Sequence, residues 1–319
     1  MSTPEEILRN LKSEDLAARK RAIFTVGEKK TVESIPILLD LLKSDPDSVI
    51  RNSAARALGK INAEQYHDQI FDSLIKALED SDYYVKANAC WSLGKLKDKR
   101  AIPSLMKMVD PNQRFYSTVG DGFTQNTISE SEASEKIREE GVKFSDVIVG
   151  AIKALGEIGD PEGIPALLSA LEDKDDGNVR CAACLALGKI KDKEAVPALV
   201  ELLKKEKYWY VRRDAIKALK KIGDPRAADE LINKISDMYD EVRKFAKKAL
   251  LSLGKQAPTA ILKLYMKNPN DEEIKKWMKN NFTRDEILEN IKRLEENEED
   301  KEKKEEFRKF FEHLLQPLV

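Results

Sequence analysis

Histidine and cysteine are scarce in this chain of 319 residues, which contains two histidines and three cysteines. Three cysteines in so long a chain do not form the disulfide framework that is typical of small secreted domains. The histidines, His67 and His313, belong to no metal motif, and no motif pairs a nucleophile with a base or forms a phosphate-binding loop. We therefore expect no catalytic residue, no cofactor and no metal ion, and hence no enzyme.

Long apolar runs and a strong net charge are also missing. No apolar run approaches the roughly 18 residues that a membrane span needs, and the first residues, MSTPEEILRN, lack the basic and apolar segments of a signal peptide. The 56 lysines and arginines nearly balance the 57 acidic residues, for a net charge of -1. We expect a cytoplasmic protein without a membrane partner, although a balanced total can hide a surface of one sign.

A repeated pattern fills most of the chain. A valine-like residue is followed by a cation, then by an alanine, and then by a small residue, leucine, glycine, lysine and isoleucine. The last position of this pattern advances by 32, 35, 62, 32, 32 and 31 residues from copy to copy, so repeat four carries an insertion of about 30 residues, roughly 110–144. The seven copies span residues 18–27, 50–59, 85–94, 147–156, 179–188, 211–220 and 242–251.

A second helical segment precedes each copy, as in IPILLDLLKS (35–44), IPALLSAL (164–171) and VPALVELL (196–203). Its proline falls near the helix start, where the missing N–H costs nothing. Apolar residues recur at helical spacing in both segments, and GD-P or KD-K links one repeat to the next. Each repeat is therefore predicted to be a helix A, a turn and a helix B, and stacked repeats bury a continuous core.

The segment VRCAACLALGKIKDKEAVPALVELL (179–203) and its siblings resemble HEAT repeats of the PBS-lyase-like family over roughly residues 4–255. The resemblance implies an all-α solenoid of about seven HEAT-like helix pairs, with the B helices on the concave face. We expect a repeat domain at 1–255, and a degenerate repeat with a helical C-terminal cap at 256–319. Members of this family attach bilins, but no residue of this sequence indicates a chromophore site.

Position two of helix B, counted from the valine-like residue, carries a cation in six of the seven repeats. The resemblance implies that these cations pair with aspartates of the preceding turns, such as Asp45, Asp82, Asp176 and Asp240. Repeat four has Ile148 there instead. Because the insertion is attached beside this helix, we expect the insertion to fold back over Ile148 and Val149.

Positions three, seven and eleven of helix B lie four apart, share one helix face and avoid the core positions. We call the residues predicted to line this face the groove face. Only Glu28 and Glu157 oppose its cations, so it is either a solvated lysine-rich surface or a site for an anionic partner. Its members are Lys20, Phe24, Arg56, Lys60, Trp91, Lys95, Lys153, Lys189, Arg213, Lys217, Lys221, Lys244 and Lys248.

Aromatic residues gather in the insertion and in the turns between helix A and helix B. Such residues either pack against neighbouring turns or anchor a partner. We call them the turn edge and predict that they form a recognition surface. They are Tyr83, Tyr84, Phe115, Tyr116, Phe123, Tyr208, Trp209, Tyr210 and Tyr239.

Three functions are compatible with this pattern. The first is a non-enzymatic scaffold that holds a protein partner, with an acidic segment, on the groove face and the turn edge. The second is a nucleic-acid binder that uses the lysine stripe. The third is a lyase-like or enzyme-maturation factor, as the family resemblance implies. The C-x-x-C pair Cys181 and Cys184 is interpreted as small apolar filler, because a closed zinc site needs about four ligands.

Overall fold

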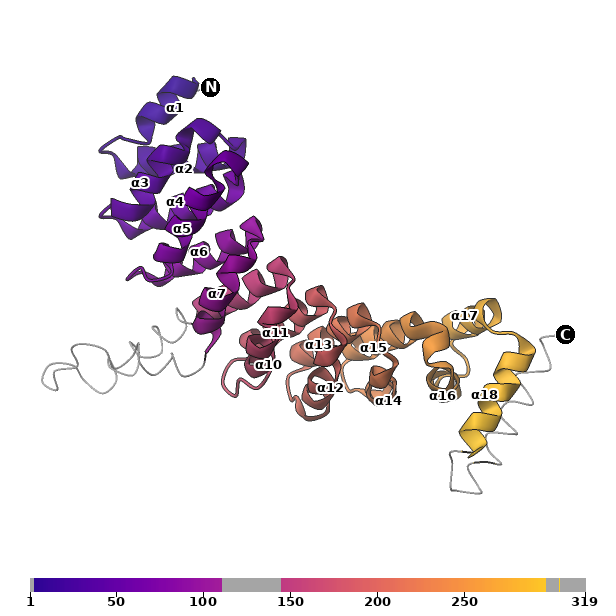
Figure 1. The fold of residues 1–319 in the computed structure, drawn as a ribbon. Coiled ribbons are helices and arrows are strands. Elements are labelled where there is room, and N and C mark those ends of the chain that lie inside the picture. Colours follow the sequence, from indigo (N-terminus) through magenta and orange to yellow (C-terminus); the bar gives the residue numbers. More distant parts are fainter. Residues whose placement is uncertain (1–2, 111–144, 297–303, 305–319) are drawn as a thin grey trace, which may run out of the picture. The chain divides into compact units, whose positions relative to one another are not determined.

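The computed structural model describes residues 3–110, 145–296 and 304 (Figure 1). Every regular element in these ranges is a helix, so the predicted all-α fold is confirmed. None of the described helices combines the length and apolar character that a membrane crossing requires. The chain divides into two units, Met1–Ile190 and Lys191–Val319. The predicted domain boundary near residue 255 lies inside the second unit and stays a prediction.

The first unit is built from alternating A and B helices, as the repeat pattern predicts. The B helices α2, α4 and α6 follow one another side by side (Figure 1). Its helices are α1 (Pro4–Asn10), α2 (Leu16–Lys29), α3 (Ile35–Ser44), α4 (Ser48–Ile61), α5 (His67–Ala77), α6 (Tyr83–Leu96), α7 (Ile102–Val109), a helix over residues 145–158, α10 (Ile164–Leu171) and α11 (Gly177–Ile190).

Within the described residues, the second unit continues the same alternation and α18 follows it. The helices α16 and α17 lie where the degenerate repeat is predicted, and this repeat and the C-terminal cap stay predictions because residues 297–303 and 305–319 lie outside the described residues. Its helices are α12 (Val196–Lys205), α13 (Trp209–Ile222), α14 (Ala228–Asn233), α15 (Asp240–Leu253), α16 (Pro258–Lys267), α17 (Glu272–Asn281) and α18 (Arg284–Glu296).

Short 3-10 turns join the repeats. Four of them start after an aspartate whose side chain accepts a hydrogen bond from the backbone N–H two residues on: Asp98, Asp160, Asp192 and Asp224. This is the capping role that aspartate favours at a helix start, and it explains the recurring D in the linkers. The 3-10 turns are η1 (Val32–Ser34), η2 (Glu64–Tyr66), η3 (Lys99–Ala101), η4 (Pro161–Gly163), η5 (Lys193–Ala195), η6 (Pro225–Ala227), η7 (Lys234–Ser236) and η8 (Gly254–Gln256).

Helix B ends in the left-handed region in both linker types. Gly159 and Gly223 have φ values of 77° and 71°, as expected for a glycine that ends a helix. In the KD-K linkers a lysine takes the same conformation, with φ of 57° at Lys97 and 62° at Lys191. A non-glycine residue pays a steric cost there, so these two ends are more strained than the glycine ends.

Position ten of helix B is glycine in five of the seven repeats, and Lys220 and Leu251 replace it in the last two. Neighbouring B helices approach closely at this glycine. A Cβ added at Gly94 would lie 2.8 Å from the Cα of Ala154, and one at Gly156 would lie 2.7 Å from the Cα of Ala186. Both neighbours occupy position eight of the next repeat, where the side chain is also small. The small-Leu-Gly run of the repeat is thus a packing requirement between B helices.

The arginines of position two pair with a different aspartate from the one expected. Nε and Nη2 of Arg51 donate to the carboxylate of Asp80 at 2.8 and 2.9 Å, and Arg212 binds Asp237 in the same bidentate way at 2.8 and 2.9 Å. These aspartates belong to the turn of the following repeat, five residues before its valine. The expectation that the aspartate lies in the turn before the arginine is therefore wrong for Arg51 and Arg212.

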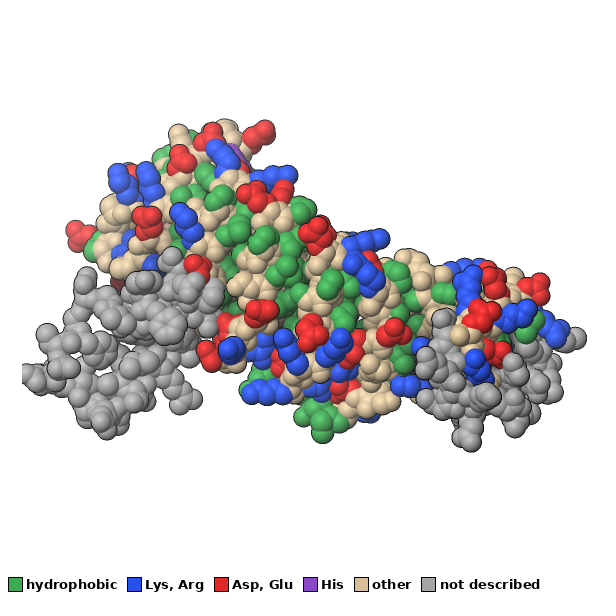
Figure 2. Space-filling model, turned by 60° about the horizontal axis from the view of Figure 1, so that its bottom comes forward, with side chains coloured by type: hydrophobic (Ala, Val, Ile, Leu, Met, Phe, Trp, Pro, Cys, Tyr) green, Lys and Arg blue, Asp and Glu red, His purple; other side chains and the backbone are tan. Residues whose placement is uncertain are grey.

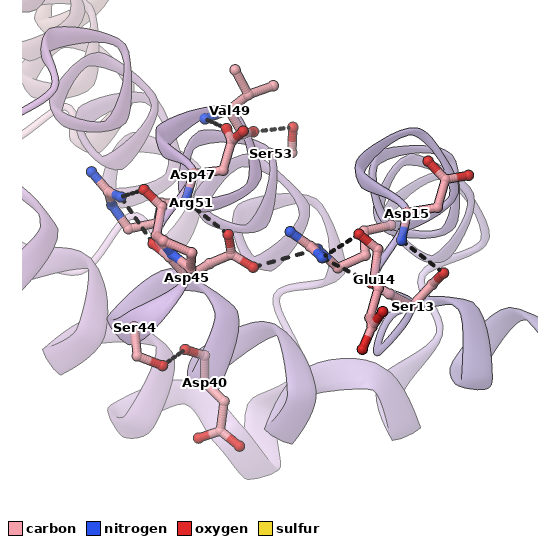
Figure 3. Close-up of polar contacts among 12 residues, drawn as sticks. Ser13, Glu14, Asp15, Asp40, Ser44, Asp45, Asp47, Val49, Arg51 and Ser53 are labelled. Carbon is pink, nitrogen blue, oxygen red and sulfur yellow. Dashed lines mark hydrogen bonds and ion pairs between the residues drawn. The ribbon is translucent and has the colours of Figure 1, made fainter.

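The aspartate three residues before the valine caps helix B instead. The side chain of Asp82 accepts from the N–H groups of Tyr84 and Val85, and that of Asp47 accepts from Val49. Figure 3 shows this division of labour in one turn: Asp47 caps α4, while Nη1 of Arg51 donates to the carbonyl of Asp45 at 2.9 Å. Arg19 pairs with the carboxylate of Asp45 at 3.5 Å.

Asp176 and Asp240 differ from this pattern in their own ways. Asp176 caps α11 through the N–H of Asn178 and accepts a hydrogen bond from the hydroxyl of Ser145. Asp240 is the one expected partner that does pair with its own position-two cation, Arg243, at 3.3 Å. The cations of position two therefore pair with an aspartate of the following turn in some repeats and with one of their own turn in repeat seven.

Ile148 is 1% exposed, and Val149 is half-buried. The apolar start of the repeat-four helix B is therefore covered. Residues 111–144 lie outside the described residues, so the expectation that the insertion covers this helix stays a prediction.

Candidate functional site

The groove face of the first unit contains a shallow pocket between α2 and α4. Its volume is about 110 Å³. Phe24 forms an exposed wall, with 66% of its surface accessible, whereas Ile23 and Ala57 are buried at its base. The pocket is lined by Lys20, Ile23, Phe24, Gly27, Ser53, Arg56, Ala57 and Lys60. Groove-face residues of repeats one and two, which are Lys20, Phe24, Arg56 and Lys60, therefore line one pocket.

Cations and aromatic rings alternate along this surface. The Nζ of Lys60 lies 5.6 Å from the centre of the Phe24 ring, and the guanidinium of Arg56 lies 5.2 Å from the centre of the Trp91 ring. Lys95 lies over the same Trp91 ring at 5.5 Å. Such contacts stabilise a cation and fix its position without neutralising its charge. Arg56 and Lys95 therefore remain available to an anion.

The two acidic residues of the face are taken by cations of the next repeat. Glu28 forms an ion pair with Lys60, and Glu157 accepts from Lys189 at 2.6 Å. The hydrogen bond from Lys189 lowers the pKa of Glu157 below its ordinary value. Lys153 is exposed and has no ion-pair partner among the described residues. The face of the first unit thus keeps a surplus of positive charge.

The second unit has a buried carboxylate that the sequence prediction omitted. Asp214, 5% exposed, accepts from Nε of Arg213 at 2.9 Å and from Nζ of Lys217 at 3.0 Å. Burial alone would raise the pKa of Asp214, but the hydrogen bonds from both cations outweigh burial and hold this pKa below its ordinary value. Two predicted groove cations thus share one carboxylate as their ion-pair partner.

The remaining groove cations of the second unit differ in their partners. Lys217 also lies 4.8 Å from the centre of the Phe245 ring, and Lys244 pairs with Asp240 at 2.5 Å. Lys221 and Lys248 are exposed and form no ion pair within the described part of the chain. The free positive charge predicted for this unit is therefore smaller than the sequence suggests.

The turn edge of the second unit is a cluster of stacked rings. Tyr208 stacks on Tyr210 at 5.5 Å between ring centres, and Trp209 stacks on Tyr239 at 5.8 Å. Met238 beside them is 82% exposed. The rings therefore pack on each other and still leave apolar surface in solvent, and the partner-binding role of these aromatics stays a prediction.

In the first unit the turn edge is smaller. Tyr84 is 50% exposed and Tyr83 is half-buried under Lys86, whose Nζ lies 5.7 Å from the ring centre. Phe115, Tyr116 and Phe123 lie outside the described residues. On the face shown in Figure 2, acidic and basic side chains are intermixed, in agreement with the nearly zero net charge.

The described residues contain no group of three or more His, Cys, Asp or Glu side chains that could hold a metal ion. Burial raises the pKa of the Cys90 thiol to about 12, so this thiol stays protonated at neutral pH. Nε2 of His67, the first residue of α5, donates a hydrogen bond to Oδ2 of Asp98 in the following linker at 2.9 Å.

Comparison with known proteins identifies relatives among lyase subunits. Phycocyanobilin lyase subunit alpha of Nostoc sp. (strain PCC 7120) is 30% identical to this chain over 189 residues, which are 57% of this chain and 60% of that protein. The chain therefore spans less than two thirds of the length of this relative.

Two solved structures are also similar. The structure of Escherichia coli YibA matches with a TM-score of 0.54 at 21% identity, covering 90% of this chain and 93% of that one, which supports the fold. The complex of CpcE and CpcF of phycocyanin lyase from Nostoc sp. PCC 7120 matches with a TM-score of 0.47 at 26% identity, covering 83% of this chain and 95% of that one.

The expectation that the chain is not an enzyme is contradicted by the relative named as a lyase subunit. The sequence contains no known set of catalytic side chains, and its repeat pattern indicates a fold without indicating an activity.

The family model for HEAT repeats matches residues 4–69, 63–117, 143–220 and 205–280, which is most of the chain. Together with the helix pairs described above, this match confirms the predicted family: the chain belongs to the HEAT-repeat family, and it is similar to a phycocyanobilin lyase subunit.

Proposed function

We propose that this chain is a HEAT-repeat subunit of a lyase-type enzyme and that it works together with a partner protein. The observation that carries the proposal is the 30% identity over 189 residues with a protein named phycocyanobilin lyase subunit alpha. A subunit of that name has at least one companion chain, which makes a protein partner the natural expectation for this chain as well.

The groove face supports this proposal through its chemistry. Phycocyanobilin, the compound in the relative's name, is a conjugated chain of four pyrrole rings with carboxylate side groups. Cations that lie over an aromatic ring, such as Arg56 and Lys95 over Trp91 at 5.2 and 5.5 Å, offer both a charge for a carboxylate and a flat surface for a ring. In this proposal the described residues bind and orient a substrate.

The partner protein is proposed to lie on the groove face and along the turn edge. Exposed aromatic and methionine side chains are enriched where proteins bind each other. Tyr84 in the first unit and Met238 with Tyr239 in the second unit are exposed in this way. The nucleic-acid alternative is not proposed, and it is one outcome of the experiment below.

The partner is tested by capture from the native host. The full chain is purified with its bound proteins after nuclease treatment, and the complex is isolated by size-exclusion chromatography. We expect one protein to remain bound in a fixed ratio, and a variant with Tyr84→Ala and Met238→Ala to retain less of it. A chain that elutes alone, or one that loses all bound material to nuclease, would contradict the proposal.

A further inference from the structure

The pocket between α2 and α4 has the form of a seat for one side chain. Its base is apolar, because Ile23 is 1% exposed and Ala57 is 4% exposed, and Gly27 also lines the pocket. A cavity of roughly 150 Å³ holds a benzene molecule, so the volume of about 110 Å³ suits a short aliphatic side chain. The exposed ring of Phe24 forms a wall that such a side chain would cover.

Charge surrounds this pocket on the solvent side. Lys20 and Arg56 are exposed and have no ion-pair partner among the described residues, and Arg56 lies over the Trp91 ring. Lys60, which also lines the pocket, is paired with Glu28. Lys95 adds a further cation over Trp91 one repeat along the stack. Lys20, Arg56 and Lys95 therefore form no ion pair with a described carboxylate, and the surface is complementary to an acidic ligand.

We propose that this surface binds an extended acidic peptide segment, one aliphatic side chain of which enters the pocket beside Phe24. The acidic residues on both sides of the aliphatic one reach Lys20 on α2 and Arg56 on α4. The inference rests on the proposed function to the extent that the segment belongs to the partner protein. The aliphatic side chain sets the register, and the carboxylates supply the charge.

The pocket separates this proposal from general attraction of anions. A lysine-rich surface without a pocket binds any polyanion according to its charge and loses affinity steeply with salt. A seat for one side chain discriminates between peptides of equal charge, because only the matching side chain removes apolar surface from water. A change of one uncharged residue, in the peptide or in the pocket, therefore tests the site.

The test measures fluorescence anisotropy of labelled synthetic peptides with the full chain at low salt. The probes are EEDELEEDE, the matched peptide EEDEAEEDE, and a short poly-dT strand. We expect the leucine peptide to bind at least about fivefold more tightly than the alanine peptide, since the additional methylenes are buried. Poly-dT is expected to bind more weakly than the leucine peptide.

Variants then separate the pocket from the charges. Lys20→Glu and Arg56→Glu should each weaken both peptides about tenfold, because each reversal removes an attraction and adds a repulsion. Ser53→Leu fills the pocket without changing charge and should weaken only the leucine peptide. Lys43→Glu on α3 reverses an exposed cation outside the pocket and serves as the matched control. Circular dichroism confirms that each variant is folded.

Equal affinity for the two peptides, or an unchanged leucine preference in Ser53→Leu, would overturn the inference, as would poly-dT that binds as tightly as the leucine peptide. If neither peptide binds but a partner protein is still captured, this inference is wrong and the proposed function stands. If the leucine peptide binds more tightly than the alanine peptide but no partner protein is captured, the proposed function is wrong and the peptide site is supported.

Discussion

At the scale of single residues, the most informative side chain is Asp214, which forms ion pairs with two of the predicted groove cations. The sequence places it at position four, next to the groove columns, but residue type alone does not show that it is buried between Arg213 and Lys217. A count of charges at positions three, seven and eleven therefore overestimates the unpaired positive charge wherever another position of the helix supplies a carboxylate.

Replacing Asp214 with asparagine should destabilise the chain by about 2–3 kcal/mol, because it leaves two cations without their buried acceptor. Urea unfolding at pH 7 measures the change. Glu201→Gln is the matched control, since Glu201 is exposed and lies in α12 of the same unit. Equal stability of the two variants would show that the carboxylate is not needed by its neighbours.

The pH dependence of stability gives a second test at the same residue. The pKa of Asp214 is lower in the folded chain than its ordinary value, so the carboxylate contributes stability that is fully present above about pH 4 and is lost as the pH falls through the lower folded pKa. The difference in unfolding free energy between wild type and Asp214→Asn should therefore shrink below about pH 4. A difference that stays constant down to pH 2 would contradict this assignment.

Arg51 shows why the expected partner of an arginine can be wrong. Aspartates stand both three and five residues before the valine of repeat three, and only the fold shows that the nearer one caps the helix while Asp80 binds the arginine. From the sequence alone, either aspartate could cap the helix or bind the arginine.

Arg51→Lys should cost about 1–2 kcal/mol, since lysine cannot reproduce the bidentate contact with Asp80 or the bonds to two backbone carbonyls. Arg21→Lys, the same change at an exposed position of α2, should cost less than about 0.5 kcal/mol. Thermal unfolding compares the two variants. A larger loss of stability for Arg21→Lys than for Arg51→Lys would contradict the stabilising role of the Arg51–Asp80 ion pair.

At the scale of elements, the helices were predictable and some of their contacts were not. Proline at the start of helix A, aspartate in the linker and the 3.6-residue spacing of apolar residues each have one local consequence, so the A and B helices follow from them. The pocket between α2 and α4 depends on how two repeats meet, and no local pattern encodes it. The insertion at 111–144 has no repeat siblings, which leaves it without such a guide.

Glycine at position ten connects sequence and packing most directly. Gly94→Ala should destabilise the chain by about 1–3 kcal/mol, because the new Cβ would lie 2.8 Å from a backbone atom of the next B helix. Gly27→Ala is the matched control: its nearest neighbour is the Ala57 side chain at 3.2 Å, and the better helix propensity of alanine offsets the contact. Chemical denaturation that ranks Gly27→Ala as the more harmful change would contradict the packing argument.

At the scale of the whole molecule, the balanced charge conceals an uneven distribution. The first unit keeps several groove cations without an acidic partner, whereas the second unit pairs most of its own. Repeat families preserve their core and vary such surfaces, so recognition of the family gives the fold and leaves the ligand open. The relation to a lyase subunit is what directs the functional proposal.

The most direct test of the central claim, that this chain is a lyase-type subunit acting with a partner protein, is the absorption spectrum of phycocyanobilin mixed with the purified, nuclease-treated complex. We expect the absorption band of phycocyanobilin to shift in the presence of the complex, and the bilin to migrate with the partner protein on a denaturing gel. An absorption spectrum identical to that of free phycocyanobilin, with no bilin on the partner protein, would show that the chain is not such a subunit.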